Sequence, residues 1–185
     1  MEGVFVRLLR RGECVNPSSL KAALQMQRAQ QVSRDGSFDL PCSADTAFPL
    51  FSPEGEKGWI SGWDPRPVFP DRIAYSHDTV FREGKGDEEA LWTIIGADPE
   101  IHRAEYVRLA PASHAAHIVV KIESLGPGRC RVSVNYTVTV FGEGTTPLLE
   151  AFSATAYAAK MRSWQHQISA YLENRKLDAI RPSPQ

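Results

Sequence analysis

Two consecutive segments in which apolar and polar residues alternate constrain the fold of this chain more than any other feature of its sequence. They are Ala115–Leu125 and Cys130–Phe141, and only the turn-forming GPGR separates them. A period of two sends successive side chains to opposite faces of a strand, so each segment predicts a strand with one buried face and one exposed face. A parallel crossover needs about a dozen residues or more. The short separator therefore predicts an antiparallel pair.

The segment that follows, from Thr145 to Leu172, has helical periodicity instead. Thr145 or Thr146 followed by Pro147 is typical of a helix start. Apolar residues then recur at steps of three and four and form one broad stripe; they are Phe152, Ala156, Tyr157, Met161, Trp164, Ile168 and Tyr171. Because a single helix with so broad a stripe needs a partner, we expect it to lie against the buried face of the sheet.

The preceding part of the chain predicts a first strand, two short helices and three more strands. The expected strands are Val32–Leu40, Arg72–Arg82, Ala90–Ala97 and His102–Leu109. The separators between the later strands are short and turn-forming, which favours antiparallel neighbours. Asp35-Gly36 suggests a bulge in the first strand. Ser43 and Ser52 suit the N-caps of the two short helices, and Pro49 should kink or end the first of them.

Composition restricts the class of partner. The 185 residues carry a formal net charge of −1 with acids and bases interspersed, which argues against nucleic acid or an anionic membrane surface as a partner. No apolar run is long enough to span a membrane. The three cysteines form no CxxC pair, so a reducing, cytoplasmic location is expected, with Cys42 and Cys130 acting as small buried apolar residues.

The element order divides the chain into three parts. Residues 1–31 form an N-terminal extension that is expected to be partly helical or loose, because chain ends are commonly loose unless they are docked. Residues 32–173 form one domain, and residues 174–185 a tail.

The sequence resembles the START-like (SRPBCC) superfamily of helix-grip proteins, and more narrowly a bacterial, polyketide cyclase/dehydrase-like branch of mostly unassigned function. The resemblance is carried by FPLFSPEGEKGWISGWDP, WTIIGADPE, HRAEYVRLAPASH and FSATAYAAKMRSWQHQISAYL. It implies an α+β fold in which a curved antiparallel sheet of about six strands wraps around the long C-terminal helix, with two short helices between the first and second strands. It also implies a cavity between sheet and helix that typically holds an apolar ligand.

Aromatic and sulfur-containing side chains are the candidates for lining that cavity, because large rings with polar tips provide both apolar surface and hydrogen bonds. The candidates are Trp59, Trp63, His77, Trp92, Tyr106, Tyr136, Tyr157, Met161 and Trp164. Trp59 is expected to pack at the mouth of the cavity, and Trp63 to form a rigid corner with Asp64-Pro65. The same residues could equally form an ordinary filled core.

No constellation of residues predicts a particular reaction. Nucleophile elbow, P-loop and dinucleotide-binding motifs are absent. His114 and His117 begin a strand, where positions three apart point to opposite faces, so no metal site is expected. No cofactor is expected, and no catalytic residue is assigned. His77 could point inward beside Tyr75, whereas Glu105 is placed on the exposed face of its strand.

Three functions remain open. The first is binding of a small apolar or amphipathic ligand, lipid- or polyketide-like, between the sheet and the long helix. The second is a cyclase- or dehydratase-type enzyme that uses His77 or Glu105 as an acid or base in the same cavity. The third is a protein without a ligand that binds a partner through the outer face of the sheet.

Overall fold

The computed structural model describes residues 29–86, 89–111, 113–141 and 145–180. Most of the predicted N-terminal extension, with Cys14, and the end of the predicted tail lie outside these residues. Within them, no helix is both long enough and apolar enough to cross a membrane.

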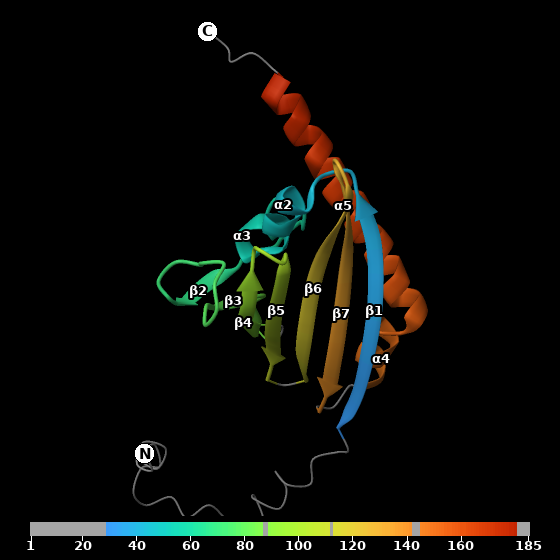
Figure 1. The fold of residues 1–185 in the computed structure, drawn as a ribbon. Coiled ribbons are helices and arrows are strands. Elements are labelled where there is room, and N and C mark those ends of the chain that lie inside the picture. Colours follow the sequence, from blue (N-terminus) through green and yellow to red (C-terminus); the bar gives the residue numbers. More distant parts are fainter. Residues whose placement is uncertain (1–28, 87–88, 112, 142–144, 181–185) are drawn as a thin grey trace, which may run out of the picture.

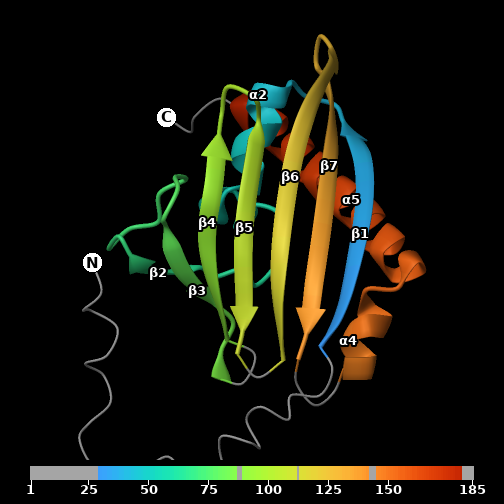
Figure 2. The ribbon, with the colours of Figure 1, turned by 60° about the horizontal axis from the view of Figure 1, so that its bottom comes forward.

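Seven antiparallel strands form one curved sheet, and the long helix α5 (Ala154–Ile180) crosses one of its faces (Figures 1 and 2). The strand order is β1-β7-β6-β5-β4-β3-β2. The strands are β1 (Gln30–Leu40), β2 (Arg66–Phe69), β3 (Val80–Glu83), β4 (Ala90–Asp98), β5 (Arg103–Ala110), β6 (His114–Gly126) and β7 (Arg129–Val140). This architecture confirms the predicted α+β helix-grip fold.

The central hairpin follows the alternation in the sequence. Strands β6 and β7 pair antiparallel, with Ile118 opposite Tyr136 and Val120 opposite Val134. The inward residues of both strands are buried, and the core continues into Phe38 of β1 and Ile168 of α5. The predicted buried face is therefore the face that α5 covers.

The first strand is regular, so the predicted bulge at Asp35-Gly36 is wrong: β1 pairs with β7 without a register shift. Gly36 has a different role. A Cβ atom at this position would lie 2.5 Å from Met161 Cγ and 2.9 Å from Tyr157 Cε1. The glycine therefore allows α5 to approach β1 closely.

The predicted strand Arg72–Arg82 is also wrong over most of its length. Only β3, at its C-terminal end, is extended in the sheet, and β2 lies before the segment as an edge strand. Asp78 has a φ of 66°, which interrupts an extended backbone. Edge strands tolerate proline because one row of their N–H groups needs no partner, which suits Pro67 in β2.

The short helices are capped as the sequence predicts. Ser43 is the N-cap of helix α2 (Ala44–Ala47). The helix ends just before Pro49, and a 3-10 turn, η1 (Phe48–Phe51), follows it. Helix α3 (Pro53–Glu56) is capped by Ser52, whose Oγ accepts a hydrogen bond of 2.9 Å from the Gly55 N–H. Together, the buried side chains of η1 fix α3 at one end of the sheet.

The C-terminal helical region is divided into α4 (Thr145–Ala151) and α5, and α5 continues past the predicted end at Leu172. Ser153 begins α5: its Oγ accepts a hydrogen bond of 3.3 Å from the Ala156 N–H, and its carbonyl accepts one of 2.9 Å from the Tyr157 N–H. The break places Phe152 between the two helices.

Candidate functional site

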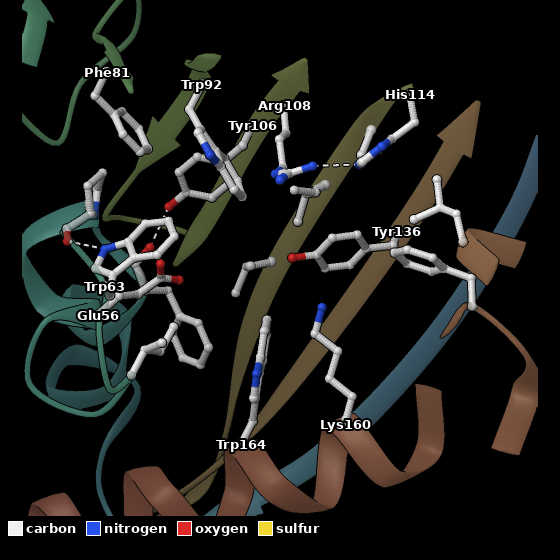
Figure 3. A pocket seen from close by; sticks show the side chains of 18 residues that line it. Glu56, Trp63, Phe81, Trp92, Tyr106, Arg108, His114, Tyr136, Lys160 and Trp164 are labelled. Carbon is white, nitrogen blue, oxygen red and sulfur yellow. Dashed lines mark hydrogen bonds between the residues drawn. The ribbon is translucent and has the colours of Figure 1, made fainter. Parts of the chain in front are cut away.

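A cavity of about 420 Å³ lies between the buried face of the sheet and the helices (Figure 3). It falls in the size range of small-molecule sites, about 300–1,000 Å³. Its lining is mostly apolar and aromatic, with a few charged groups. The lining residues are Phe51, Pro53, Glu56, Ile60, Trp63, Phe81, Trp92, Tyr106, Arg108, His114, Ala116, Ile118, Val120, Tyr136, Leu148, Phe152, Lys160 and Trp164.

Three aromatic rings form a rigid wall at the β3–β4 side of the cavity. Phe81 and Trp92 stack with ring centroids 5.7 Å apart, and Trp63 meets both rings edge-on. The indole N–H of Trp63 donates a 2.8 Å hydrogen bond to the Pro53 carbonyl, which anchors the wall to α3. Flat apolar surfaces of this kind suit a planar or alicyclic ligand body.

Two tyrosines on neighbouring parts of the sheet differ in how their hydroxyl groups are used. The Tyr106 hydroxyl donates a 2.6 Å hydrogen bond to the Phe51 carbonyl and lies 3.0 Å from the Tyr75 hydroxyl, so it is fixed in place. Figure 3 shows the Tyr136 hydroxyl directed into the cavity, and within the described part of the chain it makes no hydrogen bond. Burial raises the pKa of Tyr136. It is thus a neutral donor available to a ligand.

Arg108 brings a permanent positive charge to the cavity. Its Nη1 lies 2.5 Å from His114 Nε2, and its guanidinium carbon lies 5.6 Å from the centre of the Trp92 ring. Because arginine only donates, His114 Nε2 accepts, and its Nδ1–H donates to Ser113 Oγ at 2.8 Å. Burial and the charge of Arg108 lower the pKa of His114, so the imidazole is neutral. Among the described residues, Arg108 has no carboxylate within ion-pair distance.

Lys160 projects from α5 into a cage of aromatic rings. Its Nζ lies 4.4 Å from the centre of the Tyr136 ring, 5.0 Å from that of Trp164 and 5.8 Å from that of Phe152. In the described residues this ammonium group has neither a hydrogen bond nor an ion pair. Burial lowers the pKa of Lys160 to about 8, with Glu56 opposing the shift and Arg108 adding to it.

Glu56 points into the same cavity from the end of α3 (Figure 3). Burial raises the pKa of its carboxyl group well above the usual range, the charge of Lys160 opposes the rise and that of Glu83 adds to it. No hydrogen bond from the described residues reaches this carboxyl group. This rise in pKa weakens the negative charge that Glu56 can set against the positive charges of Arg108 and Lys160.

The structure brings some of the predicted site residues together and separates others. The predicted residues that line the cavity are Trp63, Trp92, Tyr106, Tyr136 and Trp164. Trp59 is buried beside it, where its N–H donates a 2.7 Å hydrogen bond to the Leu50 carbonyl and its ring meets that of Trp164 edge-on. Tyr157 and Met161 pack against Gly36 of β1 instead, and neither lines the cavity.

The two residues that were considered as acid or base in the cavity lie elsewhere. His77, a candidate for lining the cavity, does not line it: its side chain is 64% exposed and pairs with Asp78. Glu105 lies on the outer face, as predicted, where it pairs with Arg103 and with His117. An enzymatic function that uses either residue in the cavity is therefore excluded.

His114 and His117 lie on opposite faces of β6, in agreement with their spacing. The former lines the cavity and the latter contacts Glu105 outside it. Nowhere in the described ranges do three or more His, Cys, Asp or Glu side chains gather in a manner that could hold a metal ion.

The charged residues of the cavity were not among the predicted site residues, although two of them have a sequence signal. Arg108 is two positions after Tyr106, so strand alternation puts both on the same face. Lys160 is four positions before Trp164 and within the apolar stripe of the helix. Glu56 has no such signal, because only packing of η1 decides where α3 points.

The sequence matches no family model and no curated protein. Solved structures show the fold. A norcoclaurine synthase from Thalictrum flavum, in complex with dopamine and hydroxybenzaldehyde, superposes with a TM-score of 0.57 at 13% identity over 90% of this chain and 95% of the other. Protein Mll3558 from Rhizobium loti gives 0.54 at 15% identity over 78% and 99%, and Ara h 8.0201 gives 0.54 at 12% over 78% and 99%. The chain thus has the α+β helix-grip fold that these structures share.

Proposed function

We propose that the protein binds a small amphipathic molecule in the cavity, with an apolar body against the aromatic wall and an anionic group, such as a carboxylate, at Arg108. This refines binding of a lipid- or polyketide-like ligand, the first of the functions considered from the sequence. The neighbouring norcoclaurine synthase was solved with small aromatic molecules, which supports the aromatic body but says nothing of the anion.

One observation carries the proposal, namely the uncompensated charge of Arg108 in a mostly apolar cavity. Its side chain contacts a neutral histidine and the face of Trp92, and the described residues supply no carboxylate to it. Arg108 is half-buried, and a charge that is partly removed from water is costly unless it is paired. A ligand carboxylate would provide that pair, and the Tyr136 hydroxyl could donate a second hydrogen bond to it.

Matched probes test the proposal. Isothermal titration calorimetry should show saturable binding of 2-naphthoate and binding of 2-naphthalenemethanol, the neutral analogue, that is weaker by about 10-fold or more, since a hydrogen bond to a charged group contributes about 1.5–3 kcal/mol. Arg108→Met should abolish this preference. Arg103→Met is the matched control, because Arg103 lies on the same strand but on the outer face.

Equal affinity of the two probes for the native protein would refute an anionic ligand group. Retention of the preference for naphthoate in Arg108→Met would refute the role of that arginine. If neither probe nor a wider panel of aromatic and aliphatic acids binds, ligand binding in this cavity is itself refuted.

A further inference from the structure

We propose that Lys160 is a nucleophilic amine that condenses with an aldehyde or ketone in the cavity to form a Schiff base. This inference rests on the proposed function, because it places the carbonyl group on a ligand of the same cavity. It adds a covalent step, and with it a substrate class: a carbonyl compound with an apolar body and an anionic group.

The position of Lys160 is fixed by the packing of α5. Tyr157 and Met161 hold the helix against Gly36 of β1, and the Tyr157 hydroxyl donates a 2.8 Å hydrogen bond to the Val134 carbonyl. Trp164 lies one turn further along the helix and also lines the cavity. Because the contacts with Gly36 fix how the helix is turned, Lys160 is directed into the cavity (Figure 3).

The surroundings of the amine differ from those of the surface lysines. Lys57 and Lys121 are exposed and pair with Glu54 and Glu123. Lys160 is held by ring faces only, which leave the nitrogen lone pair of its neutral form unused. A lysine in an apolar pocket, or near another cation, is the usual form of an amine that attacks carbonyl groups.

A sufficient fraction of neutral amine is present near neutral pH. Burial and Arg108 disfavour the ammonium form, whereas Glu56 and the aromatic faces favour it, and the pKa is lowered to about 8. The other ionisable groups that line the cavity are His114, whose pKa burial lowers, and Tyr106 and Tyr136, whose pKa values burial raises, so all three are neutral near pH 8. At pH 8 about half of Lys160 is then uncharged, against about 0.3% of a lysine with the usual pKa.

The reaction balances with groups that the cavity contains. The amine nitrogen attacks the carbonyl carbon, and one N–H proton moves to the oxygen to give a carbinolamine. The hydroxyl group then takes a proton and leaves as water, while the nitrogen gives up its second proton and forms the C=N bond. Burial raises the pKa of the Glu56 carboxyl group, so its protonated form can donate the proton that the hydroxyl group takes, and the resulting carboxylate can accept the proton that the nitrogen gives up. The exchange involves no net oxidation.

Formaldehyde tests the amine without any demand on cavity shape. The native protein is treated with limiting formaldehyde and cyanoborohydride from pH 6.5 to 10, and modified lysines are located by peptide mass spectrometry. Lys160 should be modified at least about tenfold faster than Lys57 and Lys121 at pH 7.5, with half-maximal reactivity near pH 8. A Lys160 that is unreactive, or that titrates together with the two surface lysines, overturns the assignment.

A second experiment separates this inference from the proposed function. Trapping of 4-carboxybenzaldehyde with borohydride should give one adduct, on Lys160, and 4-methylbenzoate, which has no carbonyl to condense, should compete with it. Lys160→Arg should lose the adduct but still bind 4-methylbenzoate, and Lys57→Arg should behave as the native protein does. Binding of the benzoate without any adduct overturns only the Schiff base. An adduct that neutral benzaldehyde forms equally well overturns only the anionic group.

Discussion

Replacing Gly36 by alanine tests how closely α5 must approach β1. The added Cβ would lie 2.5 Å from Met161 Cγ, 2.9 Å from Tyr157 Cε1 and 3.0 Å from Met161 Sδ. These distances are well below ordinary carbon contacts of about 3.5–4.0 Å. Either the Met161 side chain changes rotamer or the helix moves away from the strand.

The expected loss of stability follows from two opposing effects. Overpacking a buried site costs about 1–3 kcal/mol. Loss of glycine freedom in the unfolded chain returns about 0.4–1 kcal/mol, because the φ of Gly36 is not in the left-handed region and alanine fits its backbone. The free energy of unfolding should therefore fall by about 1–2 kcal/mol.

Urea denaturation measures the change, and Gly96→Ala is the matched control. Gly96 is also a strand glycine outside the left-handed region, but a Cβ there would meet only the Glu105 side chain, at 3.6 Å from its Cβ and 3.8 Å from its Cγ. The control should be neutral or slightly stabilising. Equal effects of the two substitutions, or a neutral Gly36→Ala, would refute the argument from close approach.

Two further predictions concern pH. The hydrogen bond from Arg131 lowers the folded-state pKa of Asp39, so the contribution of this pair to stability is present above pH 4 and is lost as the pH falls through the folded pKa. In urea denaturation, the free energy of unfolding of Asp39→Asn should therefore decline less steeply below pH 4 than that of the native protein. An unchanged decline would count against the pair. Lys160 has a folded pKa of about 8, below its unfolded value, so stability should rise by roughly 1–3 kcal/mol as the pH goes from 8 toward 10. Lys160→Met should lack this rise, and a variant that retains it would show that the lysine is not buried in solution.

The sheet and its covering helix could be predicted because their signals are local. Period-two alternation in β6 and β7 shows which face is buried without reference to any other part of the chain. The break before α5 was missed although Ser153 is a good N-cap, because the apolar stripe continues through it and hides the interruption. Gly36 was misread for the opposite reason: a glycine signals either a bulge or a close contact, and only the position of Met161 distinguishes them.

The charged part of the cavity depends on tertiary packing, but two of its residues violate the pattern that predicts the fold. Arg108 is a cation on a strand face that is otherwise buried, and Lys160 is a cation in an apolar helical stripe. Proteins depart from such local patterns mainly at functional sites, where the stability that is lost is offset elsewhere in the fold.

These violations would carry little weight if the charges neutralised one another, because a buried ion pair can be purely structural. Within the described residues they do not pair: Arg108 contacts neutral His114, Lys160 contacts ring faces, and the Glu56 carboxyl has no hydrogen bond. A cavity that keeps an acid and two bases unpaired and directed into one apolar space is organised for a molecule that the protein itself does not supply. The calorimetric comparison of 2-naphthoate with its neutral analogue tests this most directly, because an ordinary apolar core would not bind the carboxylate more tightly than the neutral molecule.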